Sequence, residues 1–482
     1  MVETASIRAC LLEEGRHYDL EEATSKQCKG VGEKELIKAV AFMRNQVEEF
    51  SSIFREKTKR LFRFAMRLDA PPPRVVRRKL YSGFWSGVFV YSLPGGAKKE
   101  PIYIVIEPKV KNYNGMLSLI DETLSRFDKF LLLTHTIPLV SPTLFSIDAI
   151  RRVLLEAQLL LEREPKLLSQ LMADERGELL DVHVGNRGAV YRAFHMRRHL
   201  NLSLALSLAV AMKSTASALA TIANTITAME EVLRTLPSDV KTSKGLIEAV
   251  KSYVSRTRSY LASLLSDEFI SHSLFSLEAI YDGEIDFEKY WHIMHAARRL
   301  GRSAQGLEGF LGRSKQFLLP STKIYELYVY AALVKALERV YGRSTEDGLA
   351  LRIGTSELFF NHYTSDLSRM IVSLTGAVPS PDIFYQDKRI AAPIECKYRK
   401  LEGRKLHLAD AERLLSYLAD SSKNEKLKAV VVSLSVPKRE PVKARINGKE
   451  AEVCFAEVNP DTGKAEDKAK QVLSLISDEY IS

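Results

Sequence analysis

Residues Val378–Lys400 read VPSPDIFYQDKRIAAPIECKYRK, and this stretch determines how the C-terminal third of the chain is interpreted. Two apolar runs, Ile383–Tyr385 and Ile390–Ile394, lie on either side of the polar residues Gln386–Arg389. β-Favouring residues on both sides of a short polar segment are typical of an antiparallel hairpin. The stretch therefore predicts two paired strands joined by a turn over Gln386–Arg389.

The expected pairing brings acidic and basic side chains onto one face of this hairpin. If Tyr385 pairs with Ile390, Glu395 and Lys397 share a face with Asp382, because side chains alternate along a strand. Asp382 and Glu395 are then diagonal cross-strand neighbours, about 7–8 Å apart at Cα. Two carboxylates at this spacing can hold one hard divalent cation such as Mg²⁺. Lys397 would place a positive charge beside the attacking water or the developing negative charge.

The pair Pro381-Asp382, followed by Glu395-Cys396-Lys397, resembles the active site of the PD-(D/E)XK nuclease superfamily. The resemblance implies a metal-dependent deoxyribonuclease that uses Mg²⁺ or Mn²⁺. By this resemblance Asp382, Glu395 and the backbone carbonyl of Cys396 hold the metal, and Lys397 acts on the substrate. The alternative for the same residues is a solvated hairpin with a surface ion pair.

The composition of the whole chain is that of a soluble globular protein. It has 482 residues, of which 46% are hydrophobic and 27% charged, so two to four domains are expected. A formal net charge of +10 favours polyanionic partners such as DNA. The longest apolar stretch, Leu200–Ala228, is rich in Ser, Thr and Asn, which predicts a buried helix rather than a membrane span. With no signal-peptide pattern at the N-terminus, a cytoplasmic location is expected.

The four cysteines are Cys10, Cys28, Cys396 and Cys454. They form no C-x-x-C motif, so neither a zinc ribbon nor a disulfide framework is predicted. No small-molecule cofactor is expected.

The N-terminal region combines a segment predicted to be irregular, Met1–Gly32, with a strongly periodic one, Glu33–Leu68. Apolar residues recur at helical spacing along the second segment, which predicts a long helix. Basic residues on this helix and beyond it favour contact with nucleic acid or with an acidic partner surface. These candidates are Arg55, Lys59, Arg60, Arg63, Arg77, Arg78 and Lys109. A solvated helix face with a basic loop is the alternative.

The segment Ile102–Leu124 reads IYIVIEPKVKNYNGMLSLIDETL and predicts a strand that ends at Pro108-Lys109, followed by a helix from about Met116. This strand–Pro-Lys–helix order resembles the N-terminal part of McrC-type proteins, the nuclease subunits of 5-methylcytosine restriction systems. An ordinary α/β connection is the alternative.

Helical spacing dominates the middle of the chain, from Ser146 to about Gly312. It predicts an all-α middle domain or stalk. A second basic cluster here contains Arg187, Arg192, Arg197, Arg198 and His199. His292 and His295 lie three residues apart, but packing and surface contacts are favoured over a metal role for this pair.

Two helices are expected to flank the hairpin. Lys323–Tyr341 is apolar nearly all round, so this helix is buried and its Glu326 needs a partner or a metal. Resemblance to the nuclease superfamily implies that Glu326 completes or orients the metal shell, whereas the alternative is a helix-start acid stabilised by the helix dipole. On the second helix, Ala409–Ala419, the candidate supporting residues are Asp410, Arg413 and Tyr417.

The whole chain resembles an McrC-like protein with an α+β multidomain fold. The expected domains are an N-terminal α/β partner-docking domain (1–145), a helical middle domain (146–314) and a PD-(D/E)XK αβββαβ nuclease domain (315–482). Such subunits work with a separate AAA+ NTPase, an McrB-like hexamer, in DNA restriction and antiviral defence. The chain has no P-loop motif, so the motor must be another protein. The family usually has Asp-x-Lys where this chain has Glu395-Cys396-Lys397.

Two other functions stay open at this point. The chain could be a non-catalytic activator or adaptor that keeps the nuclease fold as a scaffold for an AAA+ motor. It could also be a stand-alone DNA repair or recombination nuclease. The acidic and basic residues of the hairpin argue against the first alternative, and the long helical middle argues against the second.

Overall fold

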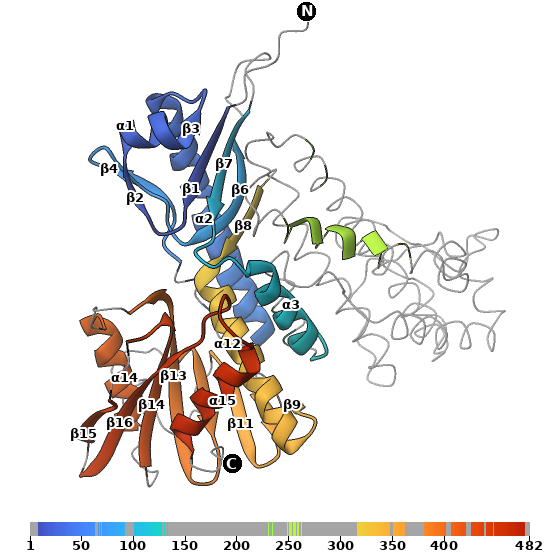
Figure 1. Cartoon of the computed structure of the whole chain (residues 1–482), viewed down its shortest axis with the longest axis vertical. Coiled ribbons are helices and arrows are strands. Elements are labelled where there is room, and N and C mark those ends of the chain that lie inside the picture. Colours follow the sequence, from blue (N-terminus) through green and yellow to red (C-terminus); the bar gives the residue numbers. More distant parts are fainter. Residues whose placement is uncertain are drawn as a thin grey trace, which may run out of the picture. The chain divides into compact units, whose positions relative to one another are not determined.

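The computed structural model shows a mixed α+β chain with two large sheets (Figure 1). It describes residues 8–62, 71–91, 101–127, 316–347, 350–361, 380–401, 406–420, 426–437, 440–446 and 448–477, and single positions at 66, 68, 70, 130, 133 and between 230 and 262. The chain forms two compact units, one of Met1–Ser141, Thr235–Val250 and Gln316–Ser482, the other of Pro142–Arg234 and Lys251–Lys315. Apart from the single positions between 230 and 262, the predicted helical middle lies outside the described residues, as do its basic cluster, His292 and His295.

A five-stranded sheet forms the N-terminal part of the first unit, in the order β3-β1-β7-β6-β8. Its strands are β1 (Ala9–Glu13), β3 (Cys28–Lys29), β6 (Trp85–Tyr91), β7 (Ile102–Glu107) and β8 (Gln316–Pro320). The central strand β7 is buried over Ile102–Ile106 because its sequence is a continuous apolar run. The expected domain boundary near residue 315 falls beside β8, which pairs with β6 of this sheet.

The expectation that Met1–Gly32 is irregular is wrong. Besides β1 and β3, the described part of this segment contains β2 (His17–Asp19), α1 (Leu20–Glu22) and the π-helix η1 (Ala23–Gln27). The expectation about disulfides is also wrong, because Cys10 and Cys28 are opposite each other on β1 and β3 and are bonded. Neighbouring antiparallel strands bring the two thiols together, although eighteen positions separate them in the sequence.

The long predicted helix is confirmed as α2 (Glu33–Phe62), with Val40, Met43, Val47 and Phe54 buried on one stripe. Beside it, β2, β5 (Lys79–Tyr81) and β4 (Arg74–Val76) form a three-stranded sheet. Among the described residues, no helix is long and apolar enough to cross a membrane.

The turn between β5 and β6 depends on Gly83, which has a positive φ of 73°. A Cβ atom there would lie 2.5 Å from the Pro71 carbonyl oxygen, whereas at Gly342, with φ of 83°, nothing lies within 4 Å. We therefore expect Gly342→Ala to lower the free energy of unfolding by about 1–3 kcal/mol through backbone strain alone, because φ of 83° with ψ of −165° is a conformation adopted almost only by glycine. Gly83→Ala should lower it further, since the close approach to the Pro71 carbonyl oxygen adds to the strain of its positive φ. Denaturant unfolding of the two variants checks this, and equal losses would contradict it.

An eight-stranded sheet forms the C-terminal part of the first unit, in the order β15-β16-β14-β13-β12-β11-β10-β9. The strands are β9 (Thr345–Asp347), β10 (Ala350–Ile353), β11 (Ser356–Phe360), β12 (Ile383–Gln386), β13 (Ile390–Lys400), β14 (Lys426–Ser435), β15 (Val442–Ile446) and β16 (Lys449–Glu457). Pairing is parallel in β13–β14–β16 and antiparallel elsewhere.

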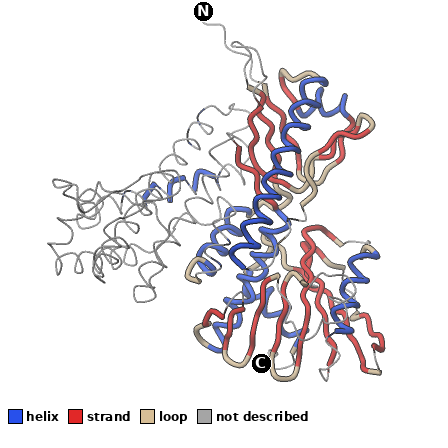
Figure 2. Tube along the Cα trace, turned by 180° about the vertical axis from the view of Figure 1, so that it is seen from behind, coloured by secondary structure: helices blue, strands red, loops and turns tan. Residues whose placement is uncertain are grey.

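Helices cover both faces of this sheet (Figures 1 and 2). On one face, α14 (Leu408–Asp420) buries Leu414 and Leu418 in a cluster with alternate residues of β14. α12 (Ser321–Tyr341) and α15 (Ala465–Ile476) pack against each other and against β13 and β14, and α3 (Tyr113–Leu124) packs against α12. The buried helix predicted over Lys323–Tyr341 is thus confirmed as α12, which ends where Gly342 adopts its positive φ.

Candidate active site

The hairpin of β12 and β13 forms, but its predicted register is wrong. Tyr385 pairs with Ala392 rather than with Ile390, a shift of two residues. The Asp387 carboxylate accepts hydrogen bonds from the backbone N–H groups of Arg389 and Ile390, both at 2.7 Å. This side chain closes a tighter turn than the four-residue one expected.

The corrected register brings Asp382 and Glu395 closer together than the predicted one. It pairs Ile383 with Ile394, so one step further Asp382 stands directly opposite Glu395. Asp382 Oδ2 accepts a hydrogen bond of 2.7 Å from the backbone N–H of Cys396. Burial raises the pKa of Glu395, and the negative charge of Asp382 raises it further.

Glu395 is almost completely buried, at 1% exposure, and its two oxygens differ. Oε2 accepts from Lys397 Nζ at 3.0 Å and from Arg413 Nη2 at 2.8 Å. Oε1 is also buried but has no hydrogen-bond partner. A buried carboxylate oxygen without a donor is costly, so this atom marks a place where a ligand or water belongs.

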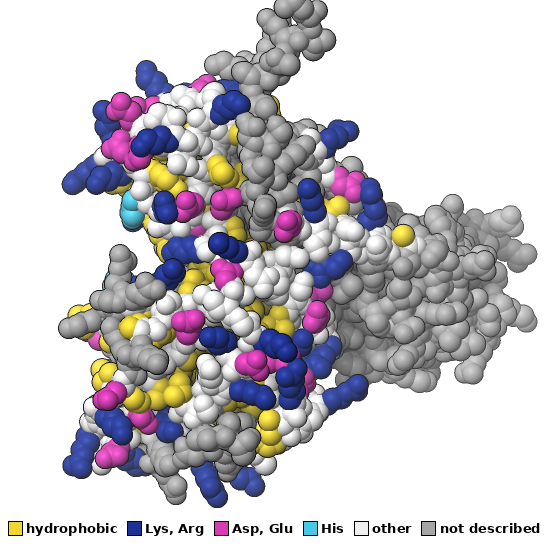
Figure 3. Space-filling view, in the orientation of Figure 1, with side chains coloured by type: hydrophobic (Ala, Val, Ile, Leu, Met, Phe, Trp, Pro, Cys, Tyr) yellow, Lys and Arg dark blue, Asp and Glu magenta, His cyan; other side chains and the backbone are white. Residues whose placement is uncertain are grey.

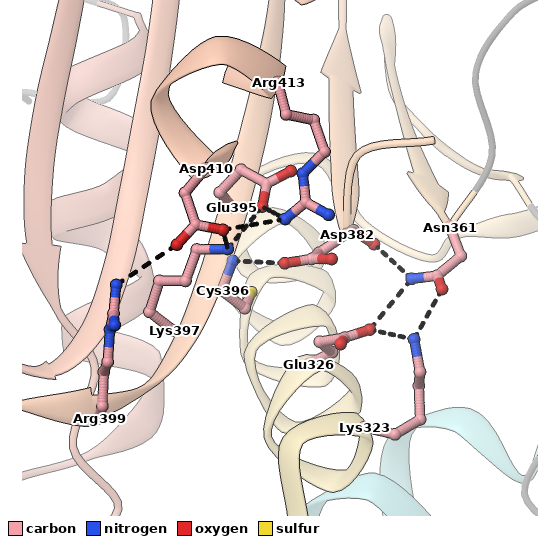
Figure 4. Close-up of polar contacts among 10 residues, drawn as sticks. All are labelled: Lys323, Glu326, Asn361, Asp382, Glu395, Cys396, Lys397, Arg399, Asp410 and Arg413. Atoms are coloured by element: carbon pink, nitrogen blue, oxygen red, sulfur yellow. Dashed lines mark hydrogen bonds and ion pairs between the residues drawn. The ribbon is translucent and has the colours of Figure 1, made fainter. Parts of the chain in front are cut away.

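Lys397 is also bound by Asp410, an acid on α14. Asp410 Oδ1 accepts from Lys397 Nζ at 2.9 Å, and Oδ2 accepts from Arg399 at 3.3 Å (Figure 4). Although burial raises the pKa of Asp410, the hydrogen bond and charge of Lys397 leave that pKa below its usual value. Burial lowers the pKa of Lys397, but Glu395, Asp382 and Asp410 raise it overall, which keeps the ammonium charged.

Glu326 lies on α12 with its own set of partners. It forms an ion pair with Lys323 and accepts from Asn361 Nδ2 at 3.1 Å. Burial raises the pKa of Glu326, Lys323 lowers it, and Asp382 raises it. The charge of Asp382 thus acts on both Glu326 and Glu395, and Asp382 lies between them in Figure 4.

The fold therefore brings Asp382, Glu395, Lys397, Asp410 and Arg413 together, with Glu326 next to Asp382. Tyr417, also on α14, is 1% exposed and packs in a hydrophobic cluster with residues of β10 to β13, and it interacts electrostatically with Arg413. Cys396 contributes a backbone N–H to Asp382, and a metal role for its carbonyl stays a prediction.

Sequence reasoning missed Lys323, Asn361 and Arg399. Lys323 stands three residues before Glu326 on a helix, a spacing that places both side chains on one face and could have pointed to it. Asn361 follows β11 and carries a positive φ of 48°, which its sequence position does not reveal.

The predicted nucleic-acid or partner residues lie on the N-terminal elements. Arg55 and Lys59 are exposed on α2, and Arg77 and Arg78 are exposed in the β4–β5 turn, both with positive φ. Lys109 is exposed after β7, and its Nζ lies 4.3 Å from the Phe84 ring centroid. The side chains of Arg60 and Arg63 lie outside the described residues.

The residues at β13 fit a divalent cation held by few protein ligands. No group of three or more His, Cys, Asp or Glu side chains in the described part of the chain could hold a metal by itself. Asp382 and Glu395 supply hard oxygen donors, and Glu395 Oε1 is buried without a partner. Mg²⁺ is commonly bound through one or two carboxylates and keeps several waters, which matches this pair.

No family model matches the chain, and no curated protein matches it. Among solved structures, one that is similar is the refined half-complex from a tetradecameric assembly of Thermococcus gammatolerans McrB AAA+ hexamers with bound McrC. The similarity covers 97% of this chain and 99% of that chain, with 11% sequence identity and a TM-score of 0.40. At this level of similarity, the function has to be argued from the site.

Proposed function

We propose that the chain is a metal-dependent deoxyribonuclease of the PD-(D/E)XK type, with Asp382, Glu395 and Lys397 at its centre. The observation that supports this most is the buried, unpartnered Glu395 Oε1 beside a second carboxylate, with a lysine 3.0 Å from the other oxygen of Glu395. Carboxylates and a lysine in this arrangement are suited to phosphodiester hydrolysis.

Each residue has a role that its contacts support. Asp382 and Glu395 would hold Mg²⁺ or Mn²⁺, with the Cys396 carbonyl as an expected third oxygen. When bound, such a cation polarises a phosphate oxygen and lowers the pKa of its water. Lys397 is held between Glu395 and Asp410, where its ammonium would orient the attacking water and offset charge on the attacked phosphate. Arg413 fixes the Glu395 carboxylate at 2.8 Å.

Metal removal tests this proposal. Duplex DNA should be cut when the chain is supplied with Mg²⁺ or Mn²⁺, and chelation by EDTA should stop the reaction. Restoring the metal in excess should restart it. Cleavage that continues unchanged in EDTA would show that the activity comes from other chemistry or from a contaminant.

We also propose that a separate AAA+ NTPase is the partner, and that the chain docks on it through the Lys109 segment. This rests on the resemblance of Ile102–Leu124 to McrC-type proteins and on the rigidity of the segment. The Lys109 N–H donates to Glu14 at 3.1 Å, and the N–H groups of Lys111 and Asn112 donate to Asp461 at 3.0 and 2.7 Å. A fixed backbone can present the exposed Lys109 side chain to another protein.

Docking is separable from cleavage in the full chain. Because β8 pairs with β6, a fragment that stops before residue 315 would lose a strand of the N-terminal sheet, so point variants are the better test. Lys397→Ala should stimulate the NTPase as well as wild type does, whereas Lys109→Ala should stimulate it less. Equal stimulation by Lys109→Ala and wild type would remove this residue from docking.

DNA binding is expected to be salt-sensitive and independent of sequence. Figure 3 shows Lys and Arg side chains spread over one face among Asp and Glu side chains, so no single basic patch dominates there. Reversing Arg77 and Arg78 to Glu should lower affinity about tenfold at moderate salt and make the salt dependence shallower. The control is the same double reversal at Lys443 and Arg445, exposed on the edge strand β15. Equal losses in both variants would mean that binding is not localised to the β4–β5 turn.

A non-catalytic adaptor is the second candidate, and one observation favours it. Acids and bases are equal in number around the site: Asp382, Glu395, Asp410 and Glu326 face Lys323, Lys397, Arg399 and Arg413. Such a balanced network can hold β13, α12 and α14 in place without a metal. A chain that stimulates the NTPase but binds no divalent metal would favour the adaptor. A cleavage rate that the AAA+ protein does not raise would favour a stand-alone nuclease.

A further inference from the structure

α12 buries a lysine next to the candidate metal site. Lys323 is 3% exposed, and its Nζ lies 5.6 Å from the Phe360 ring centroid. A buried ammonium is unfavourable unless it is paired with acceptors. Lys323 forms an ion pair with Glu326 and donates to Asn361 Oδ1 at 2.7 Å. A fixed positive charge therefore sits beside Glu326 before any metal binds.

Asn361 fixes the position of this charge. Its backbone N–H and its Nδ2 both donate to the carbonyl oxygen of Asp382 at 3.0 Å, and Nδ2 also donates to Glu326. With its amide nitrogen used in this way, the side chain must turn Oδ1 toward Lys323. Lys323, Glu326 and Asn361 thus form a closed set of hydrogen bonds tied to the backbone of Asp382.

Asp382 lies between Glu326 and Glu395 (Figure 4), and the oxygen atoms on these two sides have different partners. On the Glu326 side, one carboxylate oxygen, Oε2 of Glu326, and the side-chain oxygen Oδ1 of Asn361 both accept from the Lys323 ammonium. On the Glu395 side, one carboxylate oxygen is buried without a partner. None of the described contacts joins Glu326 to Glu395, so the two sides are separate places for positive charge.

We propose that the Lys323 ammonium occupies the place beside Glu326 where a second divalent cation would otherwise bind, so that each chain binds a single divalent metal, at Asp382 and Glu395. The inference rests on the proposed metal-dependent function. Its physical basis is that a divalent ion beside Glu326 would have to displace Lys323 from two oxygen acceptors or lie in direct repulsion with it.

Metal stoichiometry of the full chain tests the proposal without any activity measurement. Mn²⁺ binding is measured by calorimetry and by electron paramagnetic resonance of the free ion. Wild type should bind one Mn²⁺ per chain. Lys323→Ala should bind two, because Glu326 and the Asn361 Oδ1 atom then lose their positively charged partner and can serve as oxygen ligands. Lys335→Ala, on the same helix but in a surface ion pair with Glu122, and Lys323→Arg, which keeps the positive charge, should each bind one.

The possible outcomes separate this inference from the function on which it rests. Two Mn²⁺ per wild-type chain would overturn the inference and leave the metal site in place. A folded Lys323→Ala chain that still binds one would also overturn it. No Mn²⁺ bound to wild type would remove the metal site itself, and the inference with it. If Lys323→Ala does not fold, the inference is tested by the number of Mn²⁺ ions bound per chain of wild type and of Lys323→Arg, and two ions in either would overturn it.

Discussion

Replacing Lys397 with alanine is expected to lower the rate of metal-dependent DNA cleavage by about 100- to 1,000-fold, the loss typical of removing one group that stabilises transition-state charge. The ammonium lies 3.0 Å from Glu395 and 2.9 Å from Asp410, so its position is fixed before substrate binds. The measurement is single-turnover cleavage of duplex DNA with saturating metal, which separates chemistry from product release.

The matched control for this variant is Lys400→Ala, which removes an exposed lysine from the end of the same strand. Lys400→Ala should cleave at the wild-type rate, and unfolding curves should show that the Lys397→Ala chain is folded. Equal cleavage by folded Lys397→Ala and wild type would remove this lysine from the mechanism and leave only a structural ion pair.

The second large effect concerns stability and comes from Glu14, a buried carboxyl group directly after β1. Glu14 is 1% exposed, and burial raises its pKa from 4.5 to about 7. Between those two pH values the unfolded chain has released the proton while the folded chain still holds it. The free energy of unfolding therefore falls as pH rises from 4.5 to 7, by about 3 kcal/mol from this group, and changes little outside that window.

A Glu14→Gln variant has no carboxyl group to titrate at this position. Between pH 4.5 and 8 its free energy of unfolding should therefore fall by about 3 kcal/mol less than that of wild type. Denaturant unfolding at several pH values measures the difference. Glu13→Gln, a change at the neighbouring exposed acid, should follow the wild-type curve. Parallel curves for Glu14→Gln and wild type would show that Glu14 is ionised in the folded chain.

The elements around the site could be predicted because their sequence patterns are local. α12 is apolar nearly all round, and β12 and β13 are apolar runs on either side of a polar turn, so periodicity alone identifies them. The register could not be predicted, because it depends on the side chain of Asp387 bonding to the backbone of the turn. In the predicted register Asp382 is a diagonal neighbour of Glu395, whereas in the observed register it lies directly opposite Glu395.

The missed features depend on contacts between distant parts of the chain. Lys323 and Asn361 are separated by thirty-eight positions and meet only because β11 packs beside α12. Cys10 and Cys28 pair because two short strands, without a clear alternating pattern, lie side by side. Arg413 was a candidate from its spacing on the helix, but its bond to Glu395 depends on how α14 crosses β13.

The measurement that tests the central claim most directly is DNA cleavage in Mn²⁺, with the AAA+ partner present, by four preparations of the full chain. These are wild type, Asp382→Asn, Glu395→Gln and Glu357→Gln, the last being a matched change at a surface ion pair with Arg352. A metal-dependent centre at Asp382 and Glu395 predicts that wild type and Glu357→Gln cut DNA, while the other two lose at least about 100-fold. Equal rates in all four preparations, or no cleavage in any of them, would contradict the claim.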